Sequence, residues 1–211
     1  MGLGRLAVVR READSVFTRT YSAPSAGIEP ATHGLGIAGN GSTRCVPVAV
    51  CPGQPAAGVR RVRFDPAEVA ITQGGKQAYA LACEAILDPG DQIVIPTPYW
   101  PTFSEAPRLL GGRPVFAALD AGKDFAFDPD AIMKKVSRKT RALLINSPSN
   151  PTGVVVGEKA LIEMARSLAR RAPEAFLIFD DTYARLRFVD AHRGALPRVR
   201  EILVDRLIIA G

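Results

Sequence analysis

Short apolar segments alternate with segments of helical periodicity over residues 61–211. The apolar segments are VAITQ (69–73), QIVIP (92–96), PVFAAL (114–119), ALLIN (142–146), AFLIF (175–179) and RLIIA (206–210). The segments with helical periodicity are 76–87, 100–110, 128–136 and 157–171. Strands that are apolar throughout are buried on both faces, which is typical of parallel sheets covered by helices. The alternation therefore predicts an α/β fold with three α/β/α layers and a mostly parallel sheet.

Residues 1–60 differ in composition from the rest of the chain. Gly, Pro, Ala, Ser and Thr crowd this part, and turn residues recur throughout residues 27–58 without a helical or strand period. We therefore expect an irregular segment there, with no helix or strand of useful length. The sequence divides into this irregular segment and a compact domain at 61–211.

Composition narrows the classes of protein to which the chain can belong. The net charge of +6 comes from basic residues that are scattered or lie on expected helix faces, which favours a solvated surface over a nucleic-acid site. Cys45, Cys51, Cys83, His33 and His192 are too few and too dispersed for a metal site or a disulfide framework. No apolar stretch reaches 18 residues, so we expect no membrane span, and we take the cytoplasm as the default compartment.

Ligands of parallel sheets bind beyond the carboxyl ends of the strands, so the residues that follow each strand are the first candidates for a site. Gly74, Gly75 and Lys76 follow the first strand and open a helix, where free N–H groups favour an anion. An ordinary turn is an equal alternative for two glycines. A phosphate-binding P-loop is excluded, because alanine stands at position 70 and glutamine at position 77.

Three further strand ends carry polar or aromatic residues. Asp180 follows the apolar run FLIF in the segment FLIFDD (176–181). Its carboxylate can pair with a cationic ligand nitrogen or, alternatively, cap a helix or pair with an arginine. Asn150 lies in the proline-rich loop NSPSNPTG (146–153), which can hold it as a donor but can also be an ordinary loop. Trp100 can stack on a planar ligand, although core packing is the commoner fate of a tryptophan.

Three sequence runs together carry a resemblance to a known family. They are VAITQGGKQAYALACEAILDPGDQIVIPTPYWPTF (69–103), NSPSNPTG (146–153) and FDDTYARLRF (179–188), in this order. In this combination the chain resembles the fold-type I pyridoxal-phosphate enzymes, within the class I and II aminotransferases close to aspartate aminotransferase. The resemblance covers roughly residues 61–211, an incomplete large domain, and implies pyridoxal 5′-phosphate as cofactor.

The resemblance implies a role for each strand-end residue. Gly74, Gly75 and Lys76 match the turn that holds the cofactor phosphate. Trp100 matches the aromatic residue that stacks on the pyridine ring. Both matches agree with physical expectation, because a helix start favours an anion and an indole can stack on a flat ring.

The remaining matched positions concern the pyridine nitrogen and the phenolic oxygen of the cofactor. Asn150 and Tyr183 match the two donors to the phenolic oxygen, and Asp180 matches the carboxylate that keeps the pyridine nitrogen protonated. A protonated ring withdraws electrons from the substrate α-carbon, and a buried carboxylate is suited to hold that charge.

The sequence also departs from the family pattern. In the family, the strand that matches RLIIAG leads into a turn with the lysine that forms the Schiff base, so this lysine is expected beyond Gly211, and no catalytic residue is assigned within the chain. Tyr21, in YSAPSAGI (21–28), matches a tyrosine that reaches the phosphate of a neighbouring subunit. The sequence that follows residue 28 no longer resembles the family. Residues 29–60 are interpreted as a shifted reading frame or a segment of other origin.

The resemblance implies transfer of an amino group between an amino acid and a 2-oxo acid, as intact relatives perform within a homodimer. Without the Schiff-base lysine, the chain is expected to be inactive alone. The alternatives are a non-catalytic fragment or gene remnant, and a pyridoxal-phosphate-dependent lyase. An aminotransferase-like domain of a transcription regulator predicts an upstream helix-turn-helix, which residues 1–60 lack.

Overall fold

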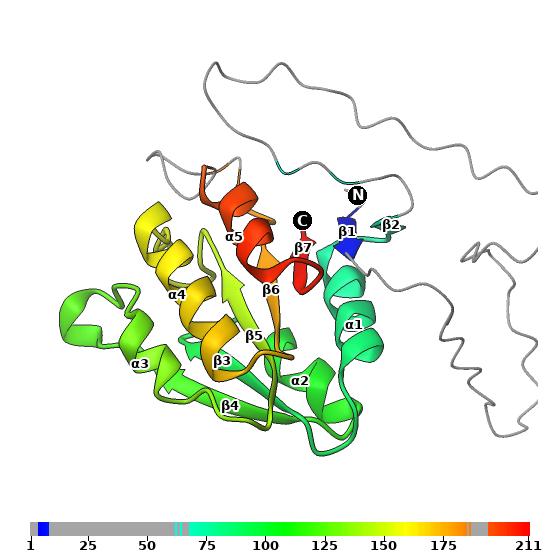
Figure 1. Ribbon diagram of the computed structural model, residues 1–211, viewed down its shortest axis with the longest axis horizontal. Helices are drawn as coiled ribbons and strands as arrows, with labels where there is room; N and C mark the ends of the chain where they lie inside the picture. Colours follow the sequence, from blue (N-terminus) through cyan, green and yellow to red (C-terminus); the bar gives the residue numbers. More distant parts are fainter. Residues whose placement is uncertain (1–3, 9–61, 63, 65–67, 185, 187–193) are drawn as a thin grey trace, which may run out of the picture. The chain divides into compact units, whose positions relative to one another are not determined.

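The described residues form a domain around a seven-stranded sheet (Figure 1). The computed structural model describes residues 4–8, 62, 64, 68–184, 186 and 194–211. In chain order, the strands are β1 (Gly4–Val8), β2 (Val69–Thr72), β3 (Gln92–Thr97), β4 (Arg113–Ala118), β5 (Thr140–Asn146), β6 (Phe176–Asp180) and β7 (Leu207–Ala210). Their order in the sheet is β2-β1-β7-β6-β5-β3-β4. Strands β7, β6, β5, β3 and β4 are parallel, and β1 is antiparallel to both its neighbours.

Helices cover the two faces of this sheet, which confirms the predicted three-layer α/β arrangement (Figure 1). They are α1 (Gly75–Ile86), α2 (Thr102–Leu109), α3 (Pro129–Met133), α4 (Glu158–Arg171) and α5 (Ala195–Leu203), with a short 3-10 helix, η2, at Ala121–Lys123. Helices α1 and α2 enclose one hydrophobic cluster against the sheet, and α3, α4 and α5 enclose the other. None of the helices in the described ranges has the length and apolarity that a membrane span requires.

Strand β6 shows how the sequence produces the two clusters. Leu177 and Phe179 pack into the cluster beneath α3, α4 and α5, whereas Ile178 packs into the cluster beneath α1 and α2. Successive side chains of a strand point to opposite faces, so a continuous apolar run fills both layers. The strand therefore has no solvated face, and its first polar side chain comes at Asp180, where the strand ends.

Helix α1 is buried along one face only, although its sequence is apolar nearly all round, a pattern that favours a fully buried helix. Ala78, Tyr79, Ala82, Cys83 and Ile86 are buried, and these positions share one face. The opposite face is exposed, and it includes alanines as well as polar residues. Alanine favours helix formation and exposes little apolar surface, so an alanine-rich sequence does not distinguish a buried helix from an amphipathic one.

The sequence prediction lacked one strand and one α-helix of the structure, besides the short η2. Gly4–Val8 forms β1, so the expectation of an irregular segment over residues 1–60 is wrong at this point. Ala195–Leu203 forms α5, which buries Leu196, Val199 and Leu203 although Pro197 lies in its first turn. Proline is tolerated in the first turn of a helix because its missing N–H has no intrahelical partner there. Tyr21 lies outside the described residues.

The parallel strands place the ends of β5 and β6 beside each other. In the register of this pair, Asn146 lies opposite Asp180, and the backbone N–H of Ser147 donates to the Asp180 carbonyl oxygen at 3.0 Å. The loop that follows β5 and the turn that follows β6 therefore leave the sheet at the same edge. This is the edge at which ligands of such sheets bind.

Candidate functional site

A pocket of about 350 Å³ lies at the carboxyl ends of β5 and β6. Its wall is formed by the start of α1, the start of α2 with the residues before it, the loop after β5 and the turn after β6. The lining residues are Gly75, Lys76, Tyr79, Trp100, Thr102, Phe103, Asn146, Asn150, Asp180, Thr182 and Tyr183. The volume falls in the range of small-molecule sites, and segments distant in sequence contribute to it.

The start of α1 approaches the turn after β6 closely. Gly74 has φ of 103°, a conformation that favours glycine, and no side chain caps the helix there. A Cβ atom on Gly75 would lie 3.1 Å from Oγ1 of Thr182, so a larger residue would crowd this contact. The glycines thus let the first turn of α1, with its N–H groups, form the pocket wall.

Lys76 and Trp100 form a cation–π pair at the mouth of the pocket. The Lys76 Nζ lies 5.5 Å from the centre of the Trp100 ring, and the tryptophan is 39% exposed. An exposed indole ring beside a lysine cation suits a planar anionic ligand.

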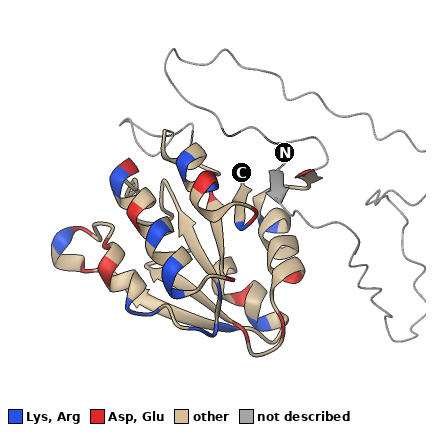
Figure 2. Cartoon of the chain, viewed as in Figure 1, with Lys and Arg blue, Asp and Glu red and all other residues tan. Residues whose placement is uncertain are grey.

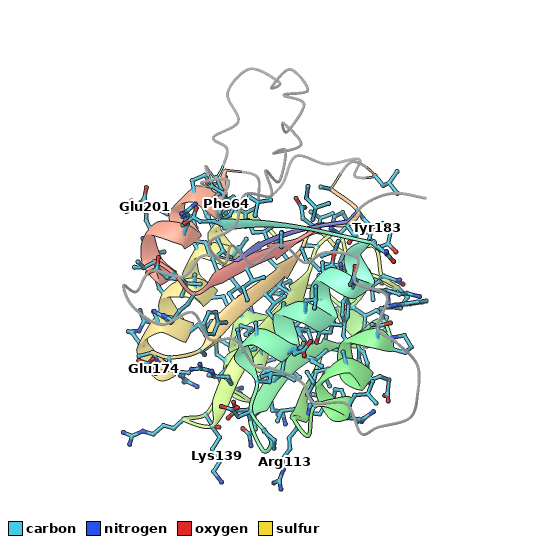
Figure 3. The ribbon with its side chains drawn as sticks, turned by 90° about the vertical axis from the view of Figure 1, so that its right-hand side faces the viewer. Phe64, Arg113, Lys139, Glu174, Tyr183 and Glu201 are labelled. Carbon is cyan, nitrogen blue, oxygen red and sulfur yellow. The ribbon has the colours of Figure 1, made fainter. Side chains whose placement is uncertain are left out.

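Asn146 organises the loop after β5. Its Oδ1 accepts a hydrogen bond from the backbone N–H of Asn150 at 2.6 Å, and its Nδ2 donates to the Asp180 carbonyl oxygen at 3.4 Å. The amide of Asn150 in turn donates to the hydroxyl of Tyr183 at 3.4 Å. Asn146 therefore connects the loop to the end of β6, and Asn150 and Tyr183 lie together as neighbouring donors (Figure 3 labels Tyr183).

Asp180 is a half-buried carboxylate without a cation of its own among the described residues. Burial raises the pKa of this carboxyl above its ordinary value, and hydrogen bonds from the hydroxyl and backbone N–H of Thr182 oppose the rise. The neighbouring charge of Asp181 adds to the rise. A carboxylate in such a position is stabilised by any cationic nitrogen that enters the pocket.

Tyr79 and Phe103 form an apolar wall of the pocket. Their rings make an edge contact at 5.1 Å, and the Tyr79 hydroxyl donates to the Phe103 carbonyl oxygen at 2.7 Å. Burial raises the pKa of Tyr79 well above its ordinary value, so the phenol stays protonated. Burial also raises the pKa of the neighbouring Cys83 thiol to about 12, which leaves this cysteine unreactive.

The structure brings together six of the seven residues that were predicted for a cofactor site. Gly75, Lys76, Trp100, Asn150, Asp180 and Tyr183 line the pocket, and Gly74 precedes it as the residue before α1. Five lining residues were not predicted: Tyr79, Thr102, Phe103, Asn146 and Thr182. A sequence signal existed for Asn146 and Thr182, since both stand at or just after a strand end.

Residues 56–207 match the family model described as aminotransferase class I and II. This match covers well over half of the chain. The chain belongs to the class I and II aminotransferases.

Similar proteins and structures agree with this family. An aspartate aminotransferase from Streptomyces avermitilis is 37% identical over 145 residues, which cover 69% of this chain and 35% of the relative. A probable aspartate/prephenate aminotransferase from Thermus aquaticus is 38% identical over 127 residues, which cover 60% of this chain and 33% of the relative. The chain thus spans about a third of the length of these aminotransferases.

Solved aminotransferase structures share the fold. The aspartate aminotransferase of Rhizobium meliloti superimposes with a TM-score of 0.63 at 32% identity, covering 69% of this chain and 36% of that one. The aspartate aminotransferase of Thermus thermophilus, solved with maleate, gives a TM-score of 0.55 at 34% identity. This match covers 59% of this chain and 32% of that one. The fold-type I assignment made from the three sequence runs is therefore confirmed.

Proposed function

We propose that this chain carries the pyridoxal 5′-phosphate site of an aminotransferase that exchanges an amino group between an amino acid and a 2-oxo acid. The observation that carries the proposal is the convergence of Lys76, Trp100, Asn150, Asp180 and Tyr183 on one pocket. These residues come from four separate segments of the chain. Membership in the class I and II aminotransferases supports the same assignment.

The chemistry of the lining residues fits this cofactor. The start of α1 and Lys76 offer N–H groups and a positive charge for a phosphate. The exposed indole of Trp100 offers a flat face for a pyridine ring. Asn150 and Tyr183 offer donors for a phenolic oxygen, and Asp180 offers a carboxylate for a protonated ring nitrogen.

When bound, this cofactor supplies an electron sink for the α-carbon of an amino acid. The residues of this chain bind and orient it. Asp180 holds the proton on the ring nitrogen, since its half-buried carboxylate has no cation beside it among the described residues and is stabilised by a positive partner. Asn150 and Tyr183 stabilise negative charge on the phenolic oxygen, and Asn146 fixes the position of Asn150.

The proposal extends to domains and partners. Residues 61–211, together with strand β1 (Gly4–Val8), which completes their sheet, act as the cofactor-binding domain, and the family match at 56–207 supports this assignment. Amino acids and 2-oxo acids are the proposed substrates, and a homodimer is the proposed assembly. The names of similar structures include aspartate, aromatic and alanine aminotransferases, so the proposal covers this reaction class and leaves the substrate side chain open.

Binding by the described residues is proposed to be non-covalent. Lys76 is the only lysine among the described residues that line the pocket, and its match is to the phosphate turn. Incubation with pyridoxal 5′-phosphate followed by borohydride is therefore expected to leave no stoichiometric pyridoxyl adduct by mass spectrometry. A stoichiometric adduct on one lysine, together with transamination, would falsify the non-covalent part of the proposal.

The experiment that tests the site itself uses the single tryptophan of the chain, Trp100. Titration with pyridoxal 5′-phosphate is expected to quench its fluorescence saturably. Pyridoxal, which lacks the phosphate, is expected to bind at least about 10-fold more weakly, because it makes no contact with the start of α1. A folded chain, verified by circular dichroism, that shows no saturable quenching would contradict the proposed site.

A further inference from the structure

Strand β1 (Gly4–Val8) lies upstream of the family match at 56–207, yet it is placed inside the sheet. It pairs antiparallel with β2 on one side and with β7 on the other. The order β2-β1-β7 leaves β2 at the edge of the sheet, so β1 is its only partner among the described strands. A segment to which the family match assigns no role therefore connects β2 to the rest of the sheet.

The pairing of β1 reaches the end of the sheet at which the pocket lies. Because β1 runs against its neighbours, its first residues lie beside their carboxyl ends. Gly4 lies opposite Thr72, the last residue of β2 before the turn that opens α1. Leu6 lies opposite Ala210, whose carbonyl oxygen accepts a hydrogen bond from the backbone N–H of Asp181 at 2.7 Å. Strand β1 thus joins the segment that leads into α1 to the segment that holds the turn after β6.

These two segments approach each other closely in the pocket wall. A Cβ atom on Gly75 would lie 3.1 Å from Oγ1 of Thr182, and α1 lies against β1 as well as β2, β6 and β7. Without β1, two strand spacings, about 10 Å, would separate β2 from β7. Strand β2 would then lack a partner or would move by one spacing, about 5 Å, to pair with β7. In either case the start of α1 loses the support that sets its distance from Thr182.

We propose that β1 is a positioning strand, whose pairing with β2 and β7 sets the distance between the start of α1 and the turn after β6 and so shapes the phosphate end of the pocket. This inference rests on the proposed function. The N–H groups of a helix start bind an anion when they point at it, so their position decides the affinity for a phosphate. The ligand ring is proposed to contact Trp100 and Asp180, whose segments do not pair with β1.

The variants Leu6→Pro and Leu6→Val separate the pairing of β1 from its mere presence in the chain. Leu6 lies opposite both Ala70 and Ala210, so it belongs to both pairings. Proline has no backbone N–H and interrupts a strand that has neighbours on both sides, whereas valine keeps the N–H and favours strands. Only Leu6→Pro is therefore expected to release β2 and the start of α1.

The test measures binding of two ligands to the full chain by Trp100 fluorescence. In Leu6→Pro, affinity for pyridoxal 5′-phosphate is expected to fall about 10-fold, whereas affinity for pyridoxal, which lacks the phosphate, is expected to change by less than about 2-fold. Leu6→Val is expected to stay within about 2-fold of the unsubstituted chain for both ligands. A general loss of folding would weaken both ligands alike. Equal losses for the two ligands in Leu6→Pro, or an unchanged affinity for pyridoxal 5′-phosphate, overturn the inference.

Hydrogen exchange tests the same connection in the ligand-free chain, and its first step needs no substitution. In the unsubstituted chain, the amides of β1 are expected to be protected as well as those of β2. In Leu6→Pro, the amides of β2 are expected to exchange at least about 10-fold faster, and those of β5 at an unchanged rate. The amide of Ala78, which donates to the Gly74 carbonyl oxygen at 3.1 Å, is expected to follow β2. Unprotected β1 amides in the unsubstituted chain overturn the inference whether or not Leu6→Pro folds.

The two measurements separate this inference from the proposed function. If exchange changes as expected but the unsubstituted chain fails to bind pyridoxal 5′-phosphate, the proposed function fails and the connection from β1 to the start of α1 stands. If the unsubstituted chain binds the ligand and Leu6→Pro binds it equally well, the proposed function stands and the role of β1 fails.

Discussion

The two ends of the parallel sheet carry similar side chains that have opposite roles. At the carboxyl end, Lys76 lies over the ring of Trp100 at 5.5 Å, and at the amino end Arg141 lies over the ring of Phe176 at 5.3 Å. Arg141 is also bound to the backbone, since its guanidinium donates to the carbonyl oxygens of Ile86 at 2.9 Å and Glu174 at 3.3 Å. No such backbone bond restrains Lys76 within the described part of the chain.

The charges at the two ends differ in the same way. Arg113, Lys139 and Glu174 project from the end of the sheet opposite Tyr183 (Figure 3), and the charged residues of the helices lie mostly on outward faces (Figure 2). Asp180, by contrast, turns a half-buried carboxylate into the pocket without a cation among the described residues. Arg141 at the amino end is bound to backbone carbonyls, whereas Lys76 and Asp180 at the carboxyl end line a pocket.

The largest expected effect comes from Asp180→Asn at the carboxyl end. The amide cannot neutralise a protonated ring nitrogen, so affinity for pyridoxal 5′-phosphate is expected to fall about 100-fold, a loss within the range for breaking a buried charge pair. Glu174→Gln removes a carboxylate from the amino end and is expected to leave affinity unchanged. Fluorescence titration of Trp100 measures both. Equal affinities for Asp180→Asn and Glu174→Gln would show that Asp180 does not hold the cofactor.

The same variant has the opposite effect on the cofactor-free chain. Burial raises the pKa of Asp180 in the folded state, so the folded state binds the proton more tightly than the unfolded state. The free energy of unfolding therefore falls as the pH rises from the ordinary aspartate pKa through the raised one. Asp180→Asn has no carboxyl to ionise, so it avoids this loss of stability. At neutral pH it is expected to unfold at a higher urea concentration than the unsubstituted chain, and in acid the two midpoints are expected to converge.

A smaller effect on stability, and none on binding, is expected for Arg141→Ala at the amino end. The change removes two hydrogen bonds to backbone carbonyls and the cover of the Phe176 ring, so the free energy of unfolding is expected to fall by about 1–3 kcal/mol. Arg138→Ala, on an exposed side chain nearby, is expected to change it by less than about 0.5 kcal/mol. Urea unfolding measures both, and equal midpoints would show that the amino end does not depend on Arg141.

The contrast between the two ends also explains how much the sequence could predict. Asp180 ends an apolar strand and Asn150 lies in the loop that follows another, so strand position marked both residues. Asn146 was assigned to its strand, because its role depends on the loop folding back so that the backbone N–H of Asn150 reaches it at 2.6 Å. Thr182 stands just after a strand end, but its proximity to Gly75, more than 100 residues away, is a tertiary contact that no local pattern contains.

The missed secondary structure has a similar cause. Gly4–Val8 becomes a strand because it pairs with both β2 and β7, so its structure depends on partners distant in sequence. Ala195–Leu203 is a short helix whose apolar face becomes evident only when it packs against α4 and the sheet. The long helices and continuous apolar strands were predictable because their periodicity is local. Tertiary contacts decide the remaining elements.

The smallest expected effect concerns Trp100, and it tests whether the aromatic ring at the carboxyl end serves a ligand. Trp100→Ala is expected to weaken pyridoxal 5′-phosphate binding about 10-fold, and Trp100→Phe about 3-fold, because the phenyl ring keeps part of the stacking face. Isothermal titration calorimetry is required, since the variants lack the only tryptophan. Both variants are expected to unfold near the unsubstituted midpoint, because the ring is 39% exposed and Lys76 is its cation partner. If Trp100→Ala instead binds normally and loses stability, Trp100 serves the fold as Phe176 does, and the distinction between the two ends fails at this residue.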